Sequence, residues 1–246
     1  MADSTPDLLS LTGLGLSDAE AFADAAAIKA AGFDLVRTAH YPPTRAFLAA
    51  AEDIKTLLRY AWQTKNAFTV PCSGTGSAAW EAAVANLTSP GDTHLVLVNG
   101  YFGLRHCDMA SRYGANIVKL EKPWGEVFSD DEVAAALAEH KPDTLWVAHA
   151  ETSTGACQPM ANLGDMCRDH DCLLMADTVT SIGGLPVKLD EWGVDACYAG
   201  GQKALSCPPG IAPDKSRQCP SHDPNCGCHG PIMGKGMVGW AGGSDD

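Results

Sequence analysis

Short apolar runs alternate with helical stretches from about residue 67 to residue 199, and this alternation restricts the fold more than any other feature of the chain. Residues 94–98 and 144–149 are near-continuous apolar runs, which are typical of strands buried on both faces of a parallel sheet. Strands that alternate with helices at this spacing predict βαβ units, with helices on both faces of the sheet. The sequence therefore predicts a three-layer α/β/α fold with a mostly parallel sheet.

The alternation also predicts where the elements lie. We expect strands at residues 68–72, 94–98, 116–120, 144–149, 172–176 and 196–199. We expect helices at residues 44–61, 78–87 and 102–113, from residue 129 onward, and at 161–170. Ser129 and Glu132 have the spacing of a capping box, which marks a helix N-terminus.

The chain divides into three regions by composition. We expect residues 1–45 to form an atypical N-terminal helical segment and residues 46–212 to form the sheet domain. Residues 213–246 are rich in glycine and proline and lack hydrophobic periodicity, which predicts a disordered tail. An alternative C-terminus is the favoured interpretation of this tail.

The tail also contains soft metal ligands. They are Cys219, His222, Cys226, Cys228 and His229. Structural zinc sites usually pair ligands two to four residues apart and separate the pairs by a longer loop. The ligands of the tail are too crowded for that pattern, so we predict no metal site.

The net charge of −13 argues against nucleic acid or an anionic membrane surface as a partner. The acidic N-terminus resembles neither a secretion signal nor an Arg-rich transit peptide. Residues 243–246 are not a peroxisomal tripeptide. The default expectation for the compartment is therefore the cytoplasm.

Three groups with complementary chemistry follow predicted strands. They are the loop of residues 73–77 before a helix, Asp177 at a strand end, and Lys203 after Gly200 and Gly201. A phosphate cradle, a carboxylate and a Schiff-base lysine are the three anchors that pyridoxal phosphate (PLP) needs. Their order predicts a PLP site at the carboxyl edge of the sheet.

Each anchor has an alternative interpretation. The loop of residues 73–77 matches neither the P-loop nor the dinucleotide fingerprint, and glycine-serine turns are common. Asp177 is equally well placed to cap the segment that follows it. An ordinary loop lysine is exposed, but the glycines before Lys203 and the apolar residues after it predict a buried and constrained position.

Two further candidates follow other strands. Thr152 would hydrogen-bond a cofactor ring oxygen, or it would belong to a capping turn. Phe102 would stack on a ring, although an aromatic residue at a helix start usually packs in the core.

The ordered motifs at residues 73–81, 89–92, 149–155, 177–184, 190–195 and 201–205 together resemble the class V, fold type I, PLP-dependent aminotransferases. The resemblance covers roughly residues 50–212 and is greatest to the alanine–glyoxylate and serine–glyoxylate aminotransferases. It implies the large PLP-binding domain of fold type I, in incomplete form.

The resemblance also implies a role for each candidate residue. Lys203 would carry the cofactor and shuttle the proton, while Asp177 would pair with the pyridine nitrogen. The ring would lie between Val179 and Phe102. At the position of Phe102, the alanine–glyoxylate enzymes often have tryptophan. The remaining contacts would be Thr75, Gly76, Ser77 and Gln202 to the phosphate and Thr152 to the ring hydroxyl.

The resemblance leaves two parts of the family pattern without a match. Residues 1–50 contain no Gly-Pro-Gly-Pro loop, and no C-terminal small domain with its substrate-binding arginine follows residue 213.

The expected function is PLP-dependent transfer of an amino group from alanine, or serine, to glyoxylate. The alternatives are a catalytically inactive PLP-binding fragment and another class V lyase. The family is homodimeric, and dimerisation of a shortened chain is in doubt. Its members are often peroxisomal or mitochondrial.

Overall fold

The computed structural model describes residues 45–66 and 68–216. The predicted N-terminal helical segment, apart from residue 45, and the tail from residue 217 lie outside the described residues, as do the five soft ligands of the tail. Contacts divide the chain between Ile54 and Lys55, and the description below concerns residues 55–216. No helix in the described part of the chain is long and apolar enough to cross a membrane.

Helix α2 (Arg45–Trp62) leads into an alternation of strands and helices. The strands are β1 (Thr69–Gly74), β2 (Thr93–Val98), β3 (Asn116–Glu121), β4 (Thr144–Ala148), β5 (Leu173–Asp177), β6 (Ala196–Tyr198) and β7 (Gly210–Ser216). The other helices are α3 (Gly76–Leu87), α4 (Tyr101–Arg112), α5 (Asp130–His140) and α6 (Leu163–Asp169).

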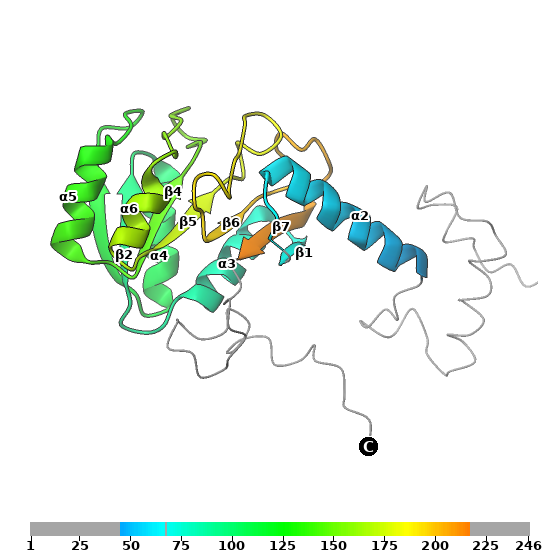
Figure 1. Cartoon of the computed structure of the whole chain (residues 1–246), viewed down its shortest axis with the longest axis horizontal. Coiled ribbons are helices and arrows are strands. Elements are labelled where there is room, and N and C mark those ends of the chain that lie inside the picture. Colours follow the sequence, from blue (N-terminus) through cyan, green and yellow to red (C-terminus); the bar gives the residue numbers. More distant parts are fainter. Residues whose placement is uncertain (1–44, 67, 217–246) are drawn as a thin grey trace, which may run out of the picture. The chain divides into compact units, whose positions relative to one another are not determined.

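The seven strands form one mixed sheet in the order β1-β7-β6-β5-β4-β2-β3 (Figure 1). The pairs β6–β5, β5–β4, β4–β2 and β2–β3 are parallel. Strand β7 is antiparallel to both of its neighbours, so it alone runs against the other six. The predicted, mostly parallel sheet is confirmed.

The order of the strands determines which helices share a face. The chain moves toward one edge of the sheet from β1 through β2 to β3, and then back through β4 and β5. Because crossovers between parallel strands are right-handed, α3 and α4 lie on one face and α5 and α6 on the other. The contacts agree, since α3 packs on α4 and α5 packs on α6. The three-layer α/β/α architecture is confirmed.

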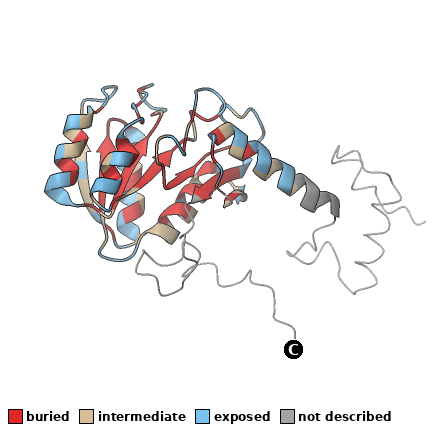
Figure 2. Ribbon diagram, viewed as in Figure 1, coloured by how far each residue is buried: buried red, intermediate tan, exposed pale blue. Residues whose placement is uncertain are grey.

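The core lies along the central strands, where almost every side chain is buried (Figure 2). All five residues of β4 are buried, and so are the last five of β2. This is the consequence of helices on both faces, which leave a central strand no solvent side. At the sheet edge, β3 instead exposes Lys119 and Glu121, and charged side chains protect such an edge from pairing with another chain.

Strand β7 was not predicted from the sequence. It contains Pro213, Asp214 and Lys215, three residue types that are uncommon in a central strand. In the structure, the Asp214 and Lys215 side chains are buried, and the Lys215 amine donates to the carbonyl of Val194. The strand continues to Ser216, four residues beyond the domain boundary predicted at residue 212.

The buried carboxyl of Asp214 makes stability depend on pH. Its Oδ1 atom has no hydrogen-bond partner among the described residues, and burial raises its pKa from 3.8 to about 7. Between about pH 4 and pH 7 the unfolded chain releases this proton while the folded chain keeps it. The free energy of unfolding therefore falls as the pH rises through this window, by up to about 4 kcal/mol.

We accordingly expect Asp214→Asn to raise the melting temperature at pH 8, and to raise it less at pH 5. Thermal unfolding followed by circular dichroism at both pH values measures the effect. The exposed residue Asp108 provides the control substitution, Asp108→Asn. A variant whose melting temperature follows that of the wild type at both pH values would refute the buried carboxyl as the cause.

Candidate functional site

A cavity of about 200 Å³ lies at the carboxyl edge of the sheet. It is bordered by the segments that follow β1, β2, β4, β5 and β6, as expected for a ligand site in an open α/β sheet. All nine residues predicted for the site line this one cavity. The lining consists of Thr75, Gly76, Ser77, Trp80, Phe102, Arg105, Ala148, Ala150, Thr152, Asp177, Val179, Gln202 and Lys203.

The turn between β1 and α3 brings a helix N-terminus to the cavity. Gly74 has a φ of 146°, which favours glycine, and an added Cβ would lie 2.8 Å from the Cβ of Ala78. Thr75 is the N-cap residue, and its hydroxyl makes no capping hydrogen bond. Backbone N–H groups and the helix dipole attract an anion at such a position, which makes residues 75–77 suited to hold a phosphate.

Arg105 adds a positive charge beside this turn, and it was missed in the sequence. Its guanidinium donates to the hydroxyl of Ser77 at 2.9 Å and lies 5.2 Å from the centre of the Trp80 ring. A signal was available, because Arg105 follows Phe102 by three residues and Trp80 follows Ser77 by three. Residues three apart on a helix share a face, so each pair reaches the same cavity.

Asp177 ends strand β5, and its side chain is only 6% exposed. Oδ1 accepts from the N–H of Val179 at 2.9 Å, and Oδ2 accepts from the hydroxyl of Tyr198 at 3.0 Å. Burial raises its pKa from 3.8 to about 6, and the charge of Glu151 adds to this rise. The two hydrogen bonds and the charge of Lys203 oppose it. One oxygen therefore caps the following turn, while the carboxyl also faces the cavity.

Lys203 lies in the loop between β6 and β7 and lines the cavity. The loop is held by backbone hydrogen bonds from Gly201 to Ile211 at 3.0 Å and from Ser206 to Lys203 at 2.9 Å. The prediction of a constrained backbone agrees with these bonds. The prediction of a buried lysine is wrong, because Lys203 is exposed in the structure.

Glu151 links the segments that carry Phe102 and Thr152. Its carboxylate is 1% exposed and accepts from the N–H of Phe102 at 3.1 Å and from the N–H of Ser153 at 3.0 Å. The hydroxyl of Thr152 in turn contacts the hydroxyl of Thr180. The buried carboxylate thus keeps the start of α4 and the loop after β4 at the same cavity.

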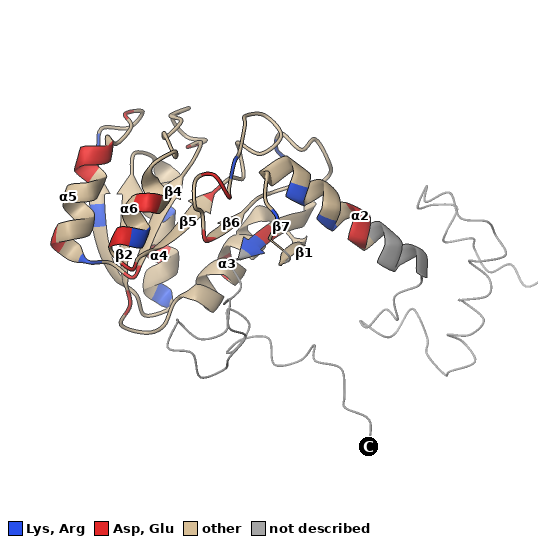
Figure 3. Ribbon diagram, in the orientation of Figure 1, with Lys and Arg blue, Asp and Glu red and all other residues tan. Residues whose placement is uncertain are grey.

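The charges at the cavity differ in sign from the charge of the whole chain. Two cationic side chains, Arg105 and Lys203, line it together with one carboxylate, Asp177. Acidic residues gather elsewhere, for example in the first turn of α5 (Figure 3). A helix N-terminus, two cations and a buried carboxylate suit a ligand with a phosphate at one end and a basic nitrogen at the other.

Comparison with known proteins agrees with this geometry. A family described as aminotransferase class V matches residues 33–212. The alanine–glyoxylate aminotransferase of Rattus norvegicus is 43% identical over 161 residues, which cover 65% of this chain and 39% of the relative. The (S)-ureidoglycine–glyoxylate transaminase of Bacillus subtilis is 40% identical over 168 residues, which cover 68% of this chain and 40% of the relative.

The solved structures give the same result. The crystal structure of an alanine–glyoxylate aminotransferase from Nostoc sp. aligns with a TM-score of 0.69 and 54% identity, and covers 70% of this chain and 45% of that one. The chain spans about two fifths of the length of the curated relatives it matches.

Proposed function

Because this chain belongs to the class V aminotransferase family, we propose that it binds PLP and transfers an amino group from alanine, or serine, to glyoxylate. One observation carries the proposal. Nine residues from five separate segments, with the chemistry needed for a phosphate, a pyridine ring and an amine linkage, line a single cavity. The names of the rat and Bacillus relatives support glyoxylate as the amino acceptor.

The residues at the cavity fit PLP. The phosphate would be held by the turn of residues 75–77, Gln202 and Arg105, and the pyridine nitrogen by Asp177. Phe102 and Val179 would contact the ring, and Thr152 its hydroxyl. When bound, PLP withdraws electrons from the substrate α-carbon.

Lys203 would perform the proton transfer. Among the residues that line the described cavity it provides the one amine. An exposed lysine Nζ can accept the proton released by the substrate α-carbon as a general base and then donate it as a general acid. Asp177 would remain ionised opposite a protonated pyridine nitrogen, because each charge stabilises the other in a buried site.

An inactive PLP-binding fragment is the second candidate function, and one observation favours it. Arg105 is the only arginine among the described residues that line the cavity, and it already contacts Ser77 and Trp80. The other cation that lines the described cavity is Lys203, which would carry the cofactor. Neither cation is therefore left to bind a substrate carboxylate. Such a fragment would bind PLP at Lys203 without converting an amino acid.

The test is a half-reaction. The full chain is loaded with PLP, freed of excess cofactor and mixed with L-alanine or L-serine under anaerobic conditions. A working site converts bound PLP to pyridoxamine phosphate and forms the corresponding 2-oxo acid in equal amount. Glyoxylate should then restore the PLP absorbance and produce glycine. A chain that binds PLP but forms no oxo acid is the inactive fragment.

Arg105→Gln is expected to weaken PLP binding about tenfold or more, because a charge-assisted hydrogen bond to phosphate contributes roughly 1.5–3 kcal/mol. Titration of tryptophan fluorescence with PLP measures the dissociation constant. Arg112→Gln is the matched control, since Arg112 lies on the same helix and is exposed beside Asp108. Equal dissociation constants for the two variants would rule out a phosphate contact of Arg105.

The assembly of the chain also belongs to the proposal. By analogy with the family we propose a homodimer, and sedimentation of the PLP-loaded chain distinguishes it from a monomer. A cytoplasmic location remains a prediction from the sequence, which fluorescence microscopy of a tagged chain would test.

A further inference from the structure

A directed chain of hydrogen bonds leads from the sheet core to the carboxyl group of Asp177. Trp146 on β4 donates its Nε1–H to the hydroxyl oxygen of Tyr198 on β6 at 3.0 Å, and this hydroxyl lies 3.0 Å from Oδ2 of Asp177. Both aromatic side chains are fully buried, and neither was singled out in the sequence. The three residues lie on adjacent strands, in the order β4, β5 and β6.

The chemistry of the three groups fixes the direction of the chain. An indole nitrogen can only donate, so the tyrosine oxygen must accept from Trp146. The hydroxyl hydrogen then points away from Trp146, and the carboxylate of Asp177 is the acceptor within reach. Trp80 stacks on the Tyr198 ring at a centroid distance of 5.5 Å, which keeps the ring from turning.

We propose that Tyr198 is a positioning residue that holds Asp177 ionised and oriented for the pyridine nitrogen, with Trp146 fixing the direction of its hydroxyl. The inference rests on the proposed PLP function, and it assigns a role to a side chain that lines no part of the cavity. A buried carboxyl tends to take up a proton, and a neutral Asp177 would lose its attraction for a positive ring nitrogen. An O–H donor on Oδ2 favours the charged form and leaves Oδ1 aligned by Val179.

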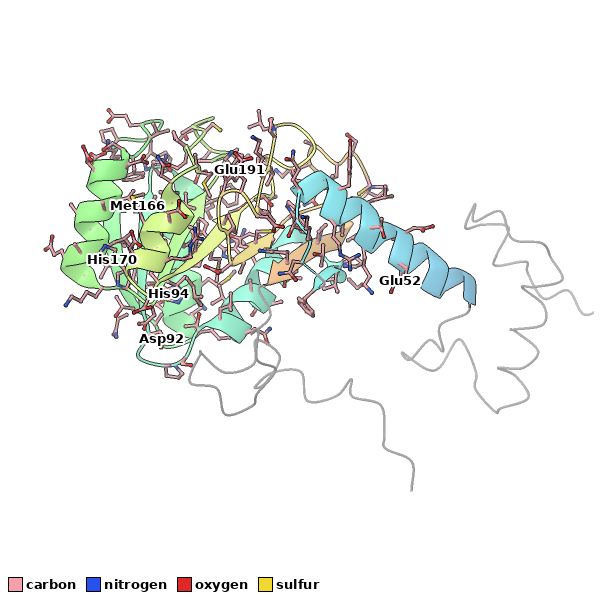
Figure 4. All side chains as sticks on the ribbon, viewed as in Figure 1. Glu52, Asp92, His94, Met166, His170 and Glu191 are labelled. Atoms are coloured by element: carbon pink, nitrogen blue, oxygen red, sulfur yellow. The ribbon has the colours of Figure 1, made fainter. Side chains whose placement is uncertain are left out.

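Other charged and titratable groups surround this chain from each neighbouring element. The charge of Glu151 raises the pKa of Asp177, and the charge of Lys203 lowers it. The charge of Arg105, on α4, lowers the pKa of Tyr198. His106 of α4 stacks 4.6 Å from Trp146, and burial keeps its pKa well below the usual value, so it adds no positive charge at neutral pH. His106 in turn contacts His94, which is labelled in Figure 4. Removing the Tyr198 hydroxyl leaves all of these groups in place.

The experiment compares the wild type with Tyr198→Phe in the full chain. The carboxyl signal of Asp177 is followed against pH by NMR of the cofactor-free protein labelled with ¹³C-aspartate, and Asp177→Asn assigns the signal. The PLP dissociation constant is measured separately by tryptophan fluorescence. We expect the titration midpoint of Asp177 to rise by about one pH unit and PLP binding to weaken about tenfold.

The chain offers a matched control in Tyr113→Phe. Tyr113 also donates its hydroxyl to a carboxylate, that of Glu81 at 3.0 Å, but neither residue lines the cavity. This variant should change neither the midpoint nor the dissociation constant. An unchanged Asp177 midpoint in folded Tyr198→Phe would overturn the proposal.

Trp146→Phe is a second test that retains the tyrosine hydroxyl. Without the indole donor the hydroxyl can rotate, so the Asp177 midpoint should rise, but less than in Tyr198→Phe. A midpoint that stays at the wild-type value would overturn the direction assigned to the chain. If the wild type binds no PLP, the proposed function fails, while the titration of the cofactor-free protein still decides the role of Tyr198.

Discussion

Lys203→Ala is expected to slow the half-reaction with L-alanine by at least about 10³-fold, because proton transfer by a positioned group contributes roughly 10²–10⁴-fold and the covalent anchor is lost with it. Rapid-scan absorbance of the PLP-loaded protein measures the rate. Loss of the amine leaves the turn of residues 75–77, Arg105 and Asp177 intact, so we expect PLP still to bind without a covalent link.

The control for this variant is Lys188→Ala, which removes a partly exposed lysine that pairs with Glu191 outside the cavity. It should react at the wild-type rate. A Lys203→Ala protein that converts L-alanine as fast as this control would show that another amine performs the proton transfer.

Asp177→Asn should lower the rate of the same half-reaction by about 10²–10³-fold, because breaking a buried charge pair costs about 2–5 kcal/mol. Asparagine keeps the size of the side chain and can still accept the hydrogen bond from the N–H of Val179. It carries no negative charge, so it cannot stabilise a proton on the pyridine nitrogen. The measurement is the single-turnover rate, with Asp108→Asn as the control for an exposed aspartate of α4. Equal rates for the two variants would remove Asp177 from the site.

The binding of PLP should also depend on pH in the wild type. Without cofactor the pKa of Asp177 is about 6, so below that value the group is neutral before PLP binds. PLP association should therefore weaken as the pH falls from 7 to 5, and Asp177→Asn should lose this part of the dependence.

Much of the fold could be predicted because local patterns agree with the tertiary structure. The apolar runs of β2 and β4 follow from burial on both faces, which the helices of βαβ units impose. The capping box at residue 129 is present in the structure, where Ser129 accepts from the N–H of Glu132 and the Glu132 carboxylate accepts from the N–H of Ser129. In both cases the sequence signal and the physical cause lie within a few residues of each other.

Strand β7 could not be predicted on the same grounds. Strand β7 lies between β6 and β1, and β1 is more than a hundred residues away in the sequence. The residues of β7 themselves favour a loop. The buried Asp214 therefore marks a place where the tertiary structure overrides local preference, at a cost in stability that the pH dependence should reveal.

The site shows the same division. The nine residues found in the sequence all lie near strand ends or helix starts, where chain order alone brings them to one edge of the sheet. Arg105 and Tyr198 depend instead on which face of a helix or strand meets the cavity, which a single sequence expresses only weakly. The exposure of Lys203 depends on what covers its loop, and no local pattern contains that information.

The most direct test of the central claim is the position at which PLP attaches. The full chain is incubated with PLP, reduced with sodium borohydride, digested and sequenced by mass spectrometry, in parallel with Lys203→Ala. We predict that the reduced cofactor is found on Lys203 in the wild type and on no lysine to a comparable extent in the variant. Labelling that spreads equally over surface lysines, or that is unchanged in Lys203→Ala, would contradict a PLP site at this cavity.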